Sequence, residues 1–269
     1  MNIVVAVKQV LDPDGVNSYA LWGRLEVDES GRAFATGGAV PQIINAYDEQ
    51  AMEAALRIRD GGEECTITAV SVGADSARDV LKRCLAMGAD SAVLVIDEKQ
   101  SNGDGFRTAK LLAAVVTNIG DVDLVLSGRQ GSDYDQGTVP GALAEYLDAS
   151  LVTMARDVAS AEGAVRVTQV TPAGEQVVEA AFPAVVSVSN EIGIPRYPTS
   201  RGMLAARRKP PEVFEAADLL DGDDGPRVEI IQLSVPDVQG HCEIIEGATP
   251  EAKAASLLEA LTANGTLSE

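Results

Sequence analysis

The sequence is poor in the side chains that most often carry acid–base or metal chemistry. It contains one histidine, His241, in 269 residues. A single histidine nearly excludes histidine-based catalytic triads and multi-histidine metal sites. The three cysteines show no metal-binding spacing: they are Cys65, Cys84 and Cys242. Cys65 and Cys84 fall within apolar patterns, so we expect buried thiols in a reducing compartment, and we predict neither a catalytic residue nor a metal site.

Basic residues and long apolar runs are also scarce. The chain has 21 Lys and Arg against 41 Asp and Glu, which gives a formal net charge of −20. Such a surface repels nucleic acid and anionic membranes, so we expect neither as a partner. The apolar segment that follows Met1 is too short for a secretion signal, and no apolar run reaches the length of a bilayer. We therefore expect a cytoplasmic protein without membrane insertion.

Aromatic residues make up only 4% of the chain, although 46% of it is hydrophobic. An interior of Ala, Val, Leu and Ile favours helices packed on a parallel sheet over a β-sandwich. Buried-strand patterns alternate with amphipathic helical patterns in the first half of the chain, which predicts parallel strands with right-handed crossovers. The expected strands cover residues 3–7, 66–72, 92–96 and 124–126. Two expected helices cover residues 48–59 and 108–116. Two further helices are expected, one capped by Asp75 or Ser76 and one ending at Leu147.

The second half of the chain shows a different pattern of predicted secondary structure. Residues 164–170 and 176–181 flank a Thr-Pro-Ala-Gly-Glu turn and predict an antiparallel hairpin, and residues 184–188 predict one more strand. We therefore predict an α/β fold, a doubly wound and mostly parallel sheet of the adenine-nucleotide-binding type, over residues 1–189. Residues 190–269 show no core of their own. We expect them to form an extended C-terminal arm that wraps the domain or another subunit and ends in a helix near residues 250–261.

The most informative segment is residues 123–147, where a short apolar run leads through a Gly- and Asp-rich loop into a helical pattern. Backbone N–H groups of such a loop and of a helix N-terminus converge on one place, which favours anion binding. Because ligands of open α/β sheets bind outside the carboxyl ends of the strands, the loops at residues 8–10, 72–75 and 128–141 could enclose one nucleotide. An ordinary turn at Gly73 remains the alternative, and Asp133 and Asp135 could bind ribose hydroxyls or cap the following helix.

The segment Ser71-Val-Gly-Ala-Asp-Ser76 suggests a second hypothesis, because it resembles the pyrophosphate loop of ATP pyrophosphatases. That loop needs two adjacent glycines after the first strand, whereas Val72 replaces one of them here and the loop follows a later strand. An adenylating enzyme on a related fold is therefore the alternative function. No Gly-x-Gly-x-x-Gly follows the first strand, which disfavours an ordinary dinucleotide dehydrogenase.

Several collinear blocks resemble the β subunit of electron transfer flavoproteins, in order and in spacing, over nearly the whole chain. These blocks begin at Ala6, Asn45, Val70, Cys84, Asp123, Phe182, Pro195 and Glu246. The resemblance implies a non-catalytic electron-carrier subunit that pairs with an α subunit in an obligate heterodimer. The α subunit would carry or share an FAD, and electrons would pass from a dehydrogenase to a quinone reductase or a similar acceptor.

The resemblance also implies that this subunit buries an adenine nucleotide, either AMP or a second FAD as in electron-bifurcating members. The residues expected around it are Ala6, Asn45, Val72, Gly73, Gly128, Asp133, Gly137, Thr138, Val139 and Gly141, with Gly137, Thr138 and Val139 near the phosphates.

Two departures from the family pattern bear on these expectations. Residues 137–140 read Gly-Thr-Val-Pro where the AMP-binding form has Asn-Gln-Thr-Gly, so three side chains that would bind a monophosphate are changed. This change, with Arg129 in place of Lys, favours a second FAD. The expected partner-docking residues are Tyr197, Ser200, Arg201, Met203 and Leu204. Ser200 replaces a leucine anchor and Arg201 a proline, so we expect the usual acyl-CoA dehydrogenase contact to be absent or rebuilt, unless Met203 or Leu204 replaces the anchor.

Overall fold

A computed structural model of the chain describes residues 1–17, 26–34, 40–97, 103–220, 225, 227–235 and 242–267. Contacts within the chain divide it into two compact units, Met1–Leu233 and Ser234–Glu269. Among the described residues, no helix is long and apolar enough to cross a membrane.

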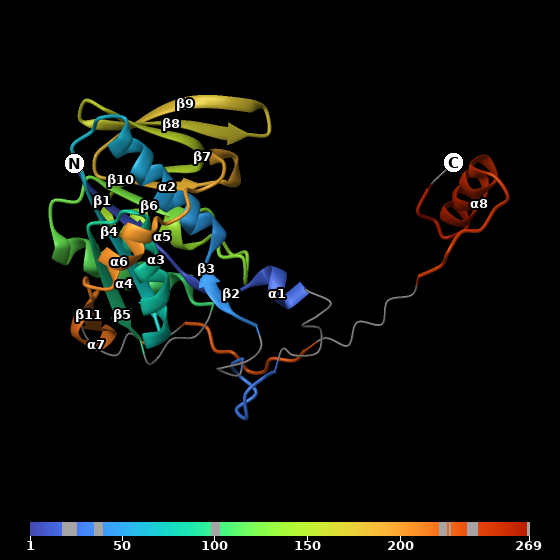
Figure 1. Ribbon diagram of the computed structural model, residues 1–269, viewed down its shortest axis with the longest axis horizontal. Coiled ribbons are helices and arrows are strands. Elements are labelled where there is room, and N and C mark those ends of the chain that lie inside the picture. Colours follow the sequence, from blue (N-terminus) through green and yellow to red (C-terminus); the bar gives the residue numbers. More distant parts are fainter. Residues whose placement is uncertain are drawn as a thin grey trace. The chain divides into compact units, whose positions relative to one another are not determined.

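A nine-stranded sheet forms the centre of the first unit (Figure 1). Its strands lie in the order β11 (Glu212–Glu215), β5 (Ser91–Ile96), β4 (Thr66–Gly73), β1 (Asn2–Ala6), β6 (Leu124–Gly128), β10 (Ala184–Val188), β7 (Ser150–Ala161), β8 (Ala164–Thr171) and β9 (Gly174–Ala181). The pairs from β11 to β7 are parallel, whereas β7, β8 and β9 pair antiparallel. Two short strands, β2 (Gln9–Leu11) and β3 (Gln42–Ile44), form a separate antiparallel pair.

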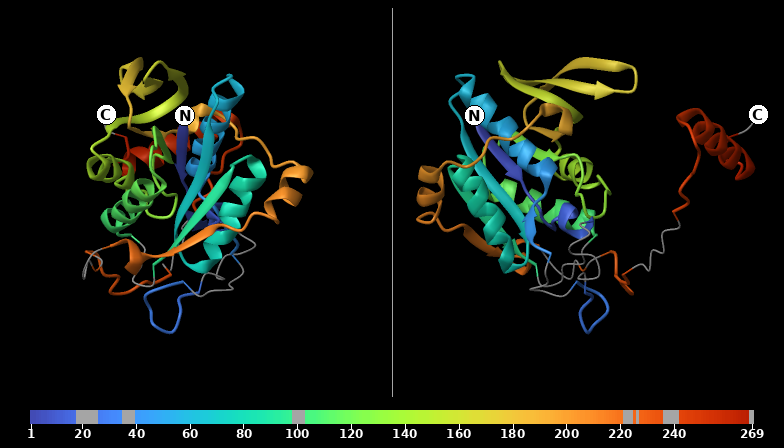
Figure 2. Two further views of the ribbon diagram at one scale, coloured as in Figure 1. Left: turned by 90° about the vertical axis from the view of Figure 1, so that its left-hand side faces the viewer. Right: turned by 45° about the vertical axis from the view of Figure 1, so that its right-hand side comes forward.

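Helices cover both faces of the sheet (Figure 2), which confirms the predicted doubly wound α/β fold. Helices α2 (Ala46–Asp60) and α3 (Arg78–Met87) pack on one face, and α4 (Gly105–Ile119) and α5 (Val139–Leu147) pack on the other. The shorter helices are α1 (Pro13–Asn17), α6 (Ser200–Ala206) and α7 (Ala216–Leu219), with 3-10 turns at Asp75–Ala77 and Asn190–Ile192. The apolar side chains on one face of α3 are buried: Val80, Leu81, Cys84 and Leu85.

The cysteines differ in their surroundings. Cys84 is fully buried, and burial raises the pKa of its thiol far above the usual range, so the thiol stays protonated. The prediction of a buried thiol is thus confirmed for Cys84 but not for Cys65, which is only partly buried, and Cys242 is exposed. His241 lies outside the described residues.

The sheet has a topological switch point at its centre. From β1 the chain builds outward through β4 to β5 on one side, and then returns to β6 on the other side of β1. The connections after β1 and before β6 run through α2 and α4, on opposite faces of the sheet. A crevice therefore opens beyond the carboxyl ends of β1, β4 and β6.

Three features differ from the predictions. Strand β7 was not predicted, and it links the parallel part of the sheet to the hairpin formed by β8 and β9. Neither Asp75 nor Ser76 caps α3, because both lie in the 3-10 turn that precedes it. The compact unit extends to Leu233, not to residue 189, because α6 packs against α3 and β11 adds a strand beside β5.

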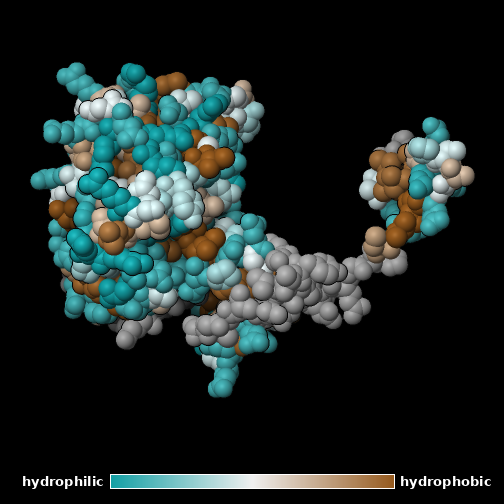
Figure 3. Space-filling model, viewed as in Figure 1, coloured by the Kyte–Doolittle hydropathy of each residue, from teal (hydrophilic) through white to brown (hydrophobic). Residues whose placement is uncertain are grey.

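The second unit contains the helix α8 (Pro250–Ala263), in agreement with the helix predicted near residues 250–261. The Thr249 hydroxyl accepts a hydrogen bond from the Ala252 N–H (3.2 Å), so this helix begins with a side-chain cap. Apolar side chains on α8, including Leu257 and Leu258, are exposed, and brown apolar residues are visible on this helix in Figure 3.

Candidate functional site

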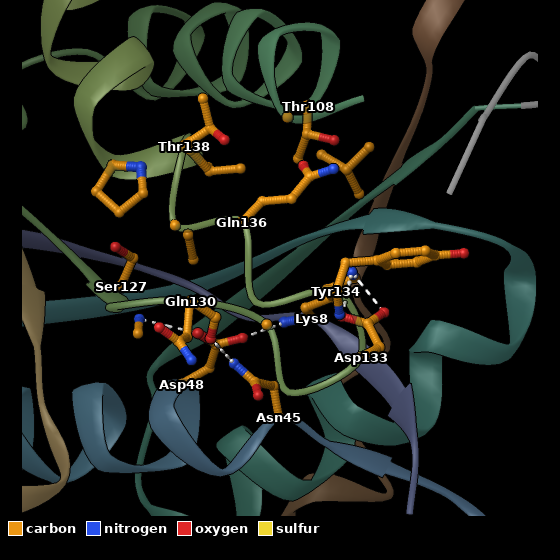
Figure 4. A pocket seen from close by; sticks show the side chains of 18 of the residues that line it. Lys8, Asn45, Asp48, Thr108, Ser127, Gln130, Asp133, Tyr134, Gln136 and Thr138 are labelled. Carbon is orange, nitrogen blue, oxygen red and sulfur yellow. Dashed lines mark hydrogen bonds and ion pairs between the residues drawn. The ribbon is translucent and has the colours of Figure 1, made fainter. Parts of the chain in front are cut away.

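A cavity lies at the switch point, beyond the carboxyl ends of β1, β4 and β6 (Figure 4). Counted out to its open mouth, the cavity has a volume of about 850 Å³. Most residues expected to bind the nucleotide line it: Ala6, Asn45, Val72, Gly128, Asp133, Gly137, Thr138 and Val139. Gly73 and Gly141 do not line this cavity, although Gly141 borders a second one described below.

The floor of the cavity is built by the first turn of α2. The two oxygens of the buried Asp48 carboxylate each accept a main-chain hydrogen bond, Oδ2 from the Lys8 N–H (2.7 Å) and Oδ1 from the Gly128 N–H (2.9 Å). Burial raises the pKa of Asp48 to about 7, although these hydrogen bonds act in the opposite direction. One side chain thus joins the ends of the two central strands.

Asn45, the residue just before α2, holds the loop that follows β6. Its Nδ2 donates to the Gln130 carbonyl (2.9 Å), and its Oδ1 accepts from the Ser132 N–H (3.1 Å). Asn45 is buried and makes no side-chain cap to its own helix. Its amide therefore orders the loop wall of the cavity.

Two acidic residues of the loop act differently from the predicted helix caps. Lys8 Nζ lies 2.6 Å from Asp133 Oδ2 and 5.3 Å from the centre of the Tyr134 ring, so Lys8 ties the end of β1 to the loop (Figure 4). Asp135 accepts from the Gln130 side chain (2.7 Å). The capping interpretation is wrong, because the residue at the N-cap of α5 is Thr138 and no side chain caps this helix.

The opposite wall is formed by the starts of α4 and α5. The α4 start is capped, because Asp104 accepts from the Arg107 N–H (3.0 Å). The α5 start has no such cap among the described residues, and Thr138, Val139 and Pro140 at this start line the cavity, where Pro140 has no N–H to offer. Gly137 has φ +64°, a conformation that glycine adopts without strain. An uncapped helix start beside a glycine turn suits an anionic group such as a phosphate.

A buried polar atom also suits a bound ligand. The Ser127 hydroxyl, at the end of β6, lines the cavity and has no hydrogen-bond partner within the described part of the chain. Buried hydroxyls are normally hydrogen-bonded. The α5 start and Ser127 therefore both offer polar groups to a ligand in this cavity.

Sequence reasoning missed several cavity residues. Asp48 was placed in a helix without a role, and Thr108 and Gln136, which also line the cavity, were not considered. The signal for Asp48 was an acidic residue in the first turn of a helix that follows a central strand, a pattern that usually indicates only a favourable interaction with the helix dipole.

The pyrophosphatase hypothesis gains no support from the geometry. Ser71 is fully buried within β4, and Asp75 and Ser76 lie in the following turn; of this segment only Val72 lines the cavity. Over the described ranges, no cluster of three or more His, Cys, Asp or Glu side chains could hold a metal ion.

The predicted docking residues lie together in the segment 194–204. Tyr197 is 79% exposed, and Met203 and Leu204 are about half exposed. Ser200 and Arg201 begin α6, and both are exposed. The segment is tied to α2, because the Arg196 N–H and guanidinium donate to the buried Glu53 carboxylate (3.0 and 2.8 Å), and Arg57 donates to the Ile192 carbonyl (2.7 Å).

These features define a doubly wound α/β protein with a ligand cavity at its switch point, the class to which many nucleotide-binding proteins belong. The electron transfer flavoprotein domain family matches residues 37–219. The chain is 34% identical to the electron transfer flavoprotein subunit beta of Megasphaera elsdenii, over 83% of this chain and 81% of that protein. It is 32% identical to the same subunit of Thermoanaerobacterium thermosaccharolyticum, over 94% and 95%.

A third relative carries a different name. The chain is 30% identical to the caffeyl-CoA reductase–Etf complex subunit CarD of Acetobacterium woodii, over 97% of this chain and 98% of that protein. The family match and the relatives agree with the predicted resemblance. The chain therefore belongs to the electron transfer flavoprotein β-subunit family.

Proposed function

We propose that this chain is the nucleotide-holding β subunit of a heterodimeric electron transfer flavoprotein. The observation that carries the proposal is the cavity at the switch point, where the uncapped start of α5 faces the loop walls held by Asn45 and Asp48. The chain would bind and orient the nucleotide through main-chain N–H groups and would not transform it. A flavin, when bound, supplies the electron-carrying chemistry, which the surrounding protein positions and tunes.

We propose that the nucleotide is a second FAD and not AMP. Gly137, Val139 and Pro140 offer no side-chain hydrogen bond to a monophosphate. A second cavity adjoins the first, because Gln130, Gly137 and Pro140 line both. It continues along Leu151, Met154 and Ser187, and so offers space beyond the phosphate position.

Extraction of cofactors from the purified heterodimer tests this proposal. Two FAD per heterodimer and no AMP would support it. One FAD and one AMP would refute the second FAD but keep the adenine-nucleotide site. Neither nucleotide, or release of pyrophosphate from ATP by the isolated chain, would refute the proposed function and favour the adenylating alternative.

We further propose that the partners are an α subunit, a dehydrogenase donor and a quinone reductase-type acceptor, in the cytoplasm. The arm that ends in α8 presents exposed apolar side chains, which suits wrapping of the α subunit. The segment 194–204 would dock the electron donor. Because Ser200 lacks an apolar side chain, we expect weak binding to an acyl-CoA dehydrogenase. Tight binding that Met203→Ala abolishes would show that Met203 replaces the anchor.

A further inference from the structure

The first turn of α2, at the floor of the main cavity, contacts the chain at the ends of both β1 and β6. Lys8 and Gly128 sit at the carboxyl ends of β1 and β6, on either side of the switch point, and both line the cavity. The only side chain described as hydrogen-bonding to both is that of Asp48, one oxygen to each main-chain N–H. The carboxylate is therefore placed to set the distance between the Lys8 and Gly128 main chains.

The contact between Asp48 and Gly128 leaves no room for a side chain at position 128. A Cβ at position 128 would lie 2.4 Å from Asp48 Oδ1 and 2.6 Å from Tyr47 Cβ, well inside the van der Waals limit. Asp48 is only 6% exposed, and both of its oxygens are engaged by the protein. Asp48 is thus unsuited to direct recognition of a ligand and well suited to hold the groups that make it.

We propose that Asp48 is a positioning residue for the adenine nucleotide, which acts by fixing the Lys8 and Gly128 main chains at the spacing that the adenylate moiety requires. This inference rests on the proposed nucleotide site. It assigns a specific binding role to a carboxylate that does not itself contact the nucleotide. Lys8 also joins the end of β1 to the loop after β6, because its ammonium group forms an ion pair with Asp133.

The variant Asp48→Asn separates this role from general stability. An asparagine of the same size offers one acceptor oxygen, so it can accept from Lys8 or from Gly128 but not from both. The matched control is Glu53→Gln. Glu53 is also buried and lies on the same helix, but its carboxylate binds Arg196 and Arg57 and does not border the cavity.

The affinities of the full chain for AMP and for FAD would be measured by calorimetry, beside its stability in urea. We expect Asp48→Asn to weaken binding of both about tenfold, in line with the loss of one hydrogen bond to a main-chain N–H. Glu53→Gln should lose stability with unchanged affinity. If Asp48→Asn binds both ligands as the wild type does, the inference is wrong and the proposed site stands. If the wild type binds neither ligand, the proposed function fails, and the inference with it.

A second measurement needs no variant and so covers the case in which Asp48→Asn does not fold. Amide hydrogen exchange at Lys8 and Gly128 would be followed in the wild-type chain with and without AMP or FAD. We expect both amides to exchange several-fold more slowly when a nucleotide is bound, because binding stabilises the hydrogen bonds that the Lys8 and Gly128 N–H groups donate to Asp48. Unchanged exchange at both positions, together with measurable binding, would overturn the inference.

Discussion

The first half of α2 carries a buried carboxylate toward each of its ends, Asp48 and Glu53, and the two have opposite electrostatic surroundings. At the start of the helix, Asp48 accepts hydrogen bonds from main-chain N–H groups, and burial raises its pKa to about 7. Little more than one turn later, Glu53 is also buried, but the guanidinium groups of Arg196 and Arg57 outweigh the burial and lower its pKa. Burial alone therefore does not determine ionisation; the charge of the partner decides it.

The two carboxylates therefore support different parts of the molecule, the segment 194–204 and the cavity. Glu53 holds the exposed segment 194–204 through its ion pair with Arg196. Because the pKa of Glu53 is lowered, this ion pair persists at neutral pH. The Asp48 end holds the cavity walls through a group that titrates near neutral pH. We therefore expect substitutions at the two ends to separate nucleotide binding from partner docking.

The largest effect is expected at the Asp48 end, from Gly128→Ala. The added methyl group would overlap Asp48 Oδ1 and Tyr47, and overpacking of this kind destabilises by about 3 kcal/mol. Urea unfolding would measure it. The control is Gly141→Ala, where a Cβ meets nothing within 4 Å and alanine favours the helix. Equal stabilities of the two variants would contradict the close contact at Gly128.

At the other end, Glu53→Gln should cost about 2 kcal/mol, because it leaves the Arg196 and Arg57 guanidinium groups without their shared carboxylate. Loss of the ion pairs should also loosen residues 192–197, which limited proteolysis would detect as faster cleavage. If cleavage there is unchanged while stability falls, Glu53 supports the helix but not the docking segment.

The pH dependence of stability should differ between the ends. Asp48 has a folded pKa of about 7 against a value of 3.8 without the protein environment, so between these values the native chain holds a proton that the unfolded chain releases. Its contribution to stability therefore falls as the pH rises through this window, by about 1 kcal/mol between pH 6 and pH 7. Asp48→Asn should remove this decline. A wild type and a variant with parallel stability profiles would show that Asp48 titrates normally.

The smallest effect is expected from Thr199→Ala at the start of α6. The Thr199 hydroxyl accepts from the Gly202 N–H (3.0 Å), and loss of such a cap costs about 0.5–1 kcal/mol. Hydrogen exchange of the first turn of α6 would report it, while exchange at the Asp48 end should stay unchanged. Faster exchange at both ends would mean that the two regions are coupled through α2.

Much of the fold could be predicted, because buried parallel strands and amphipathic helices leave regular apolar patterns. Strand β7 was missed for a physical reason: its pairing shifts register where Val152 and Ala155 face Val186 and Val188, and Met154 has φ +57° there. Such a bulge breaks the two-residue alternation by which strands are recognised.

The candidate site was predicted in part. The loop predicted at residues 128–141 was found from its glycines and its position between a strand and a helix. The roles of Asp133 and Asp135 were not, because their partners Lys8 and Gln130 are chosen by how the loop folds back on β1. The local signal of Asp48, an acidic residue in a first helical turn, does not reveal its role, since its hydrogen-bond partners are 40 and 80 positions away in the chain.

The sequence by itself determined the alternation of strands and helices, the glycine loop and the family, because these depend on local patterns and collinear blocks. Only the tertiary structure decided which side chains hold the cavity and which groups meet Asp48 and Glu53 on α2. Hydrogen bonds between distant segments depend on how the strands are ordered in the sheet, and that order places Asp48 between the ends of β1 and β6.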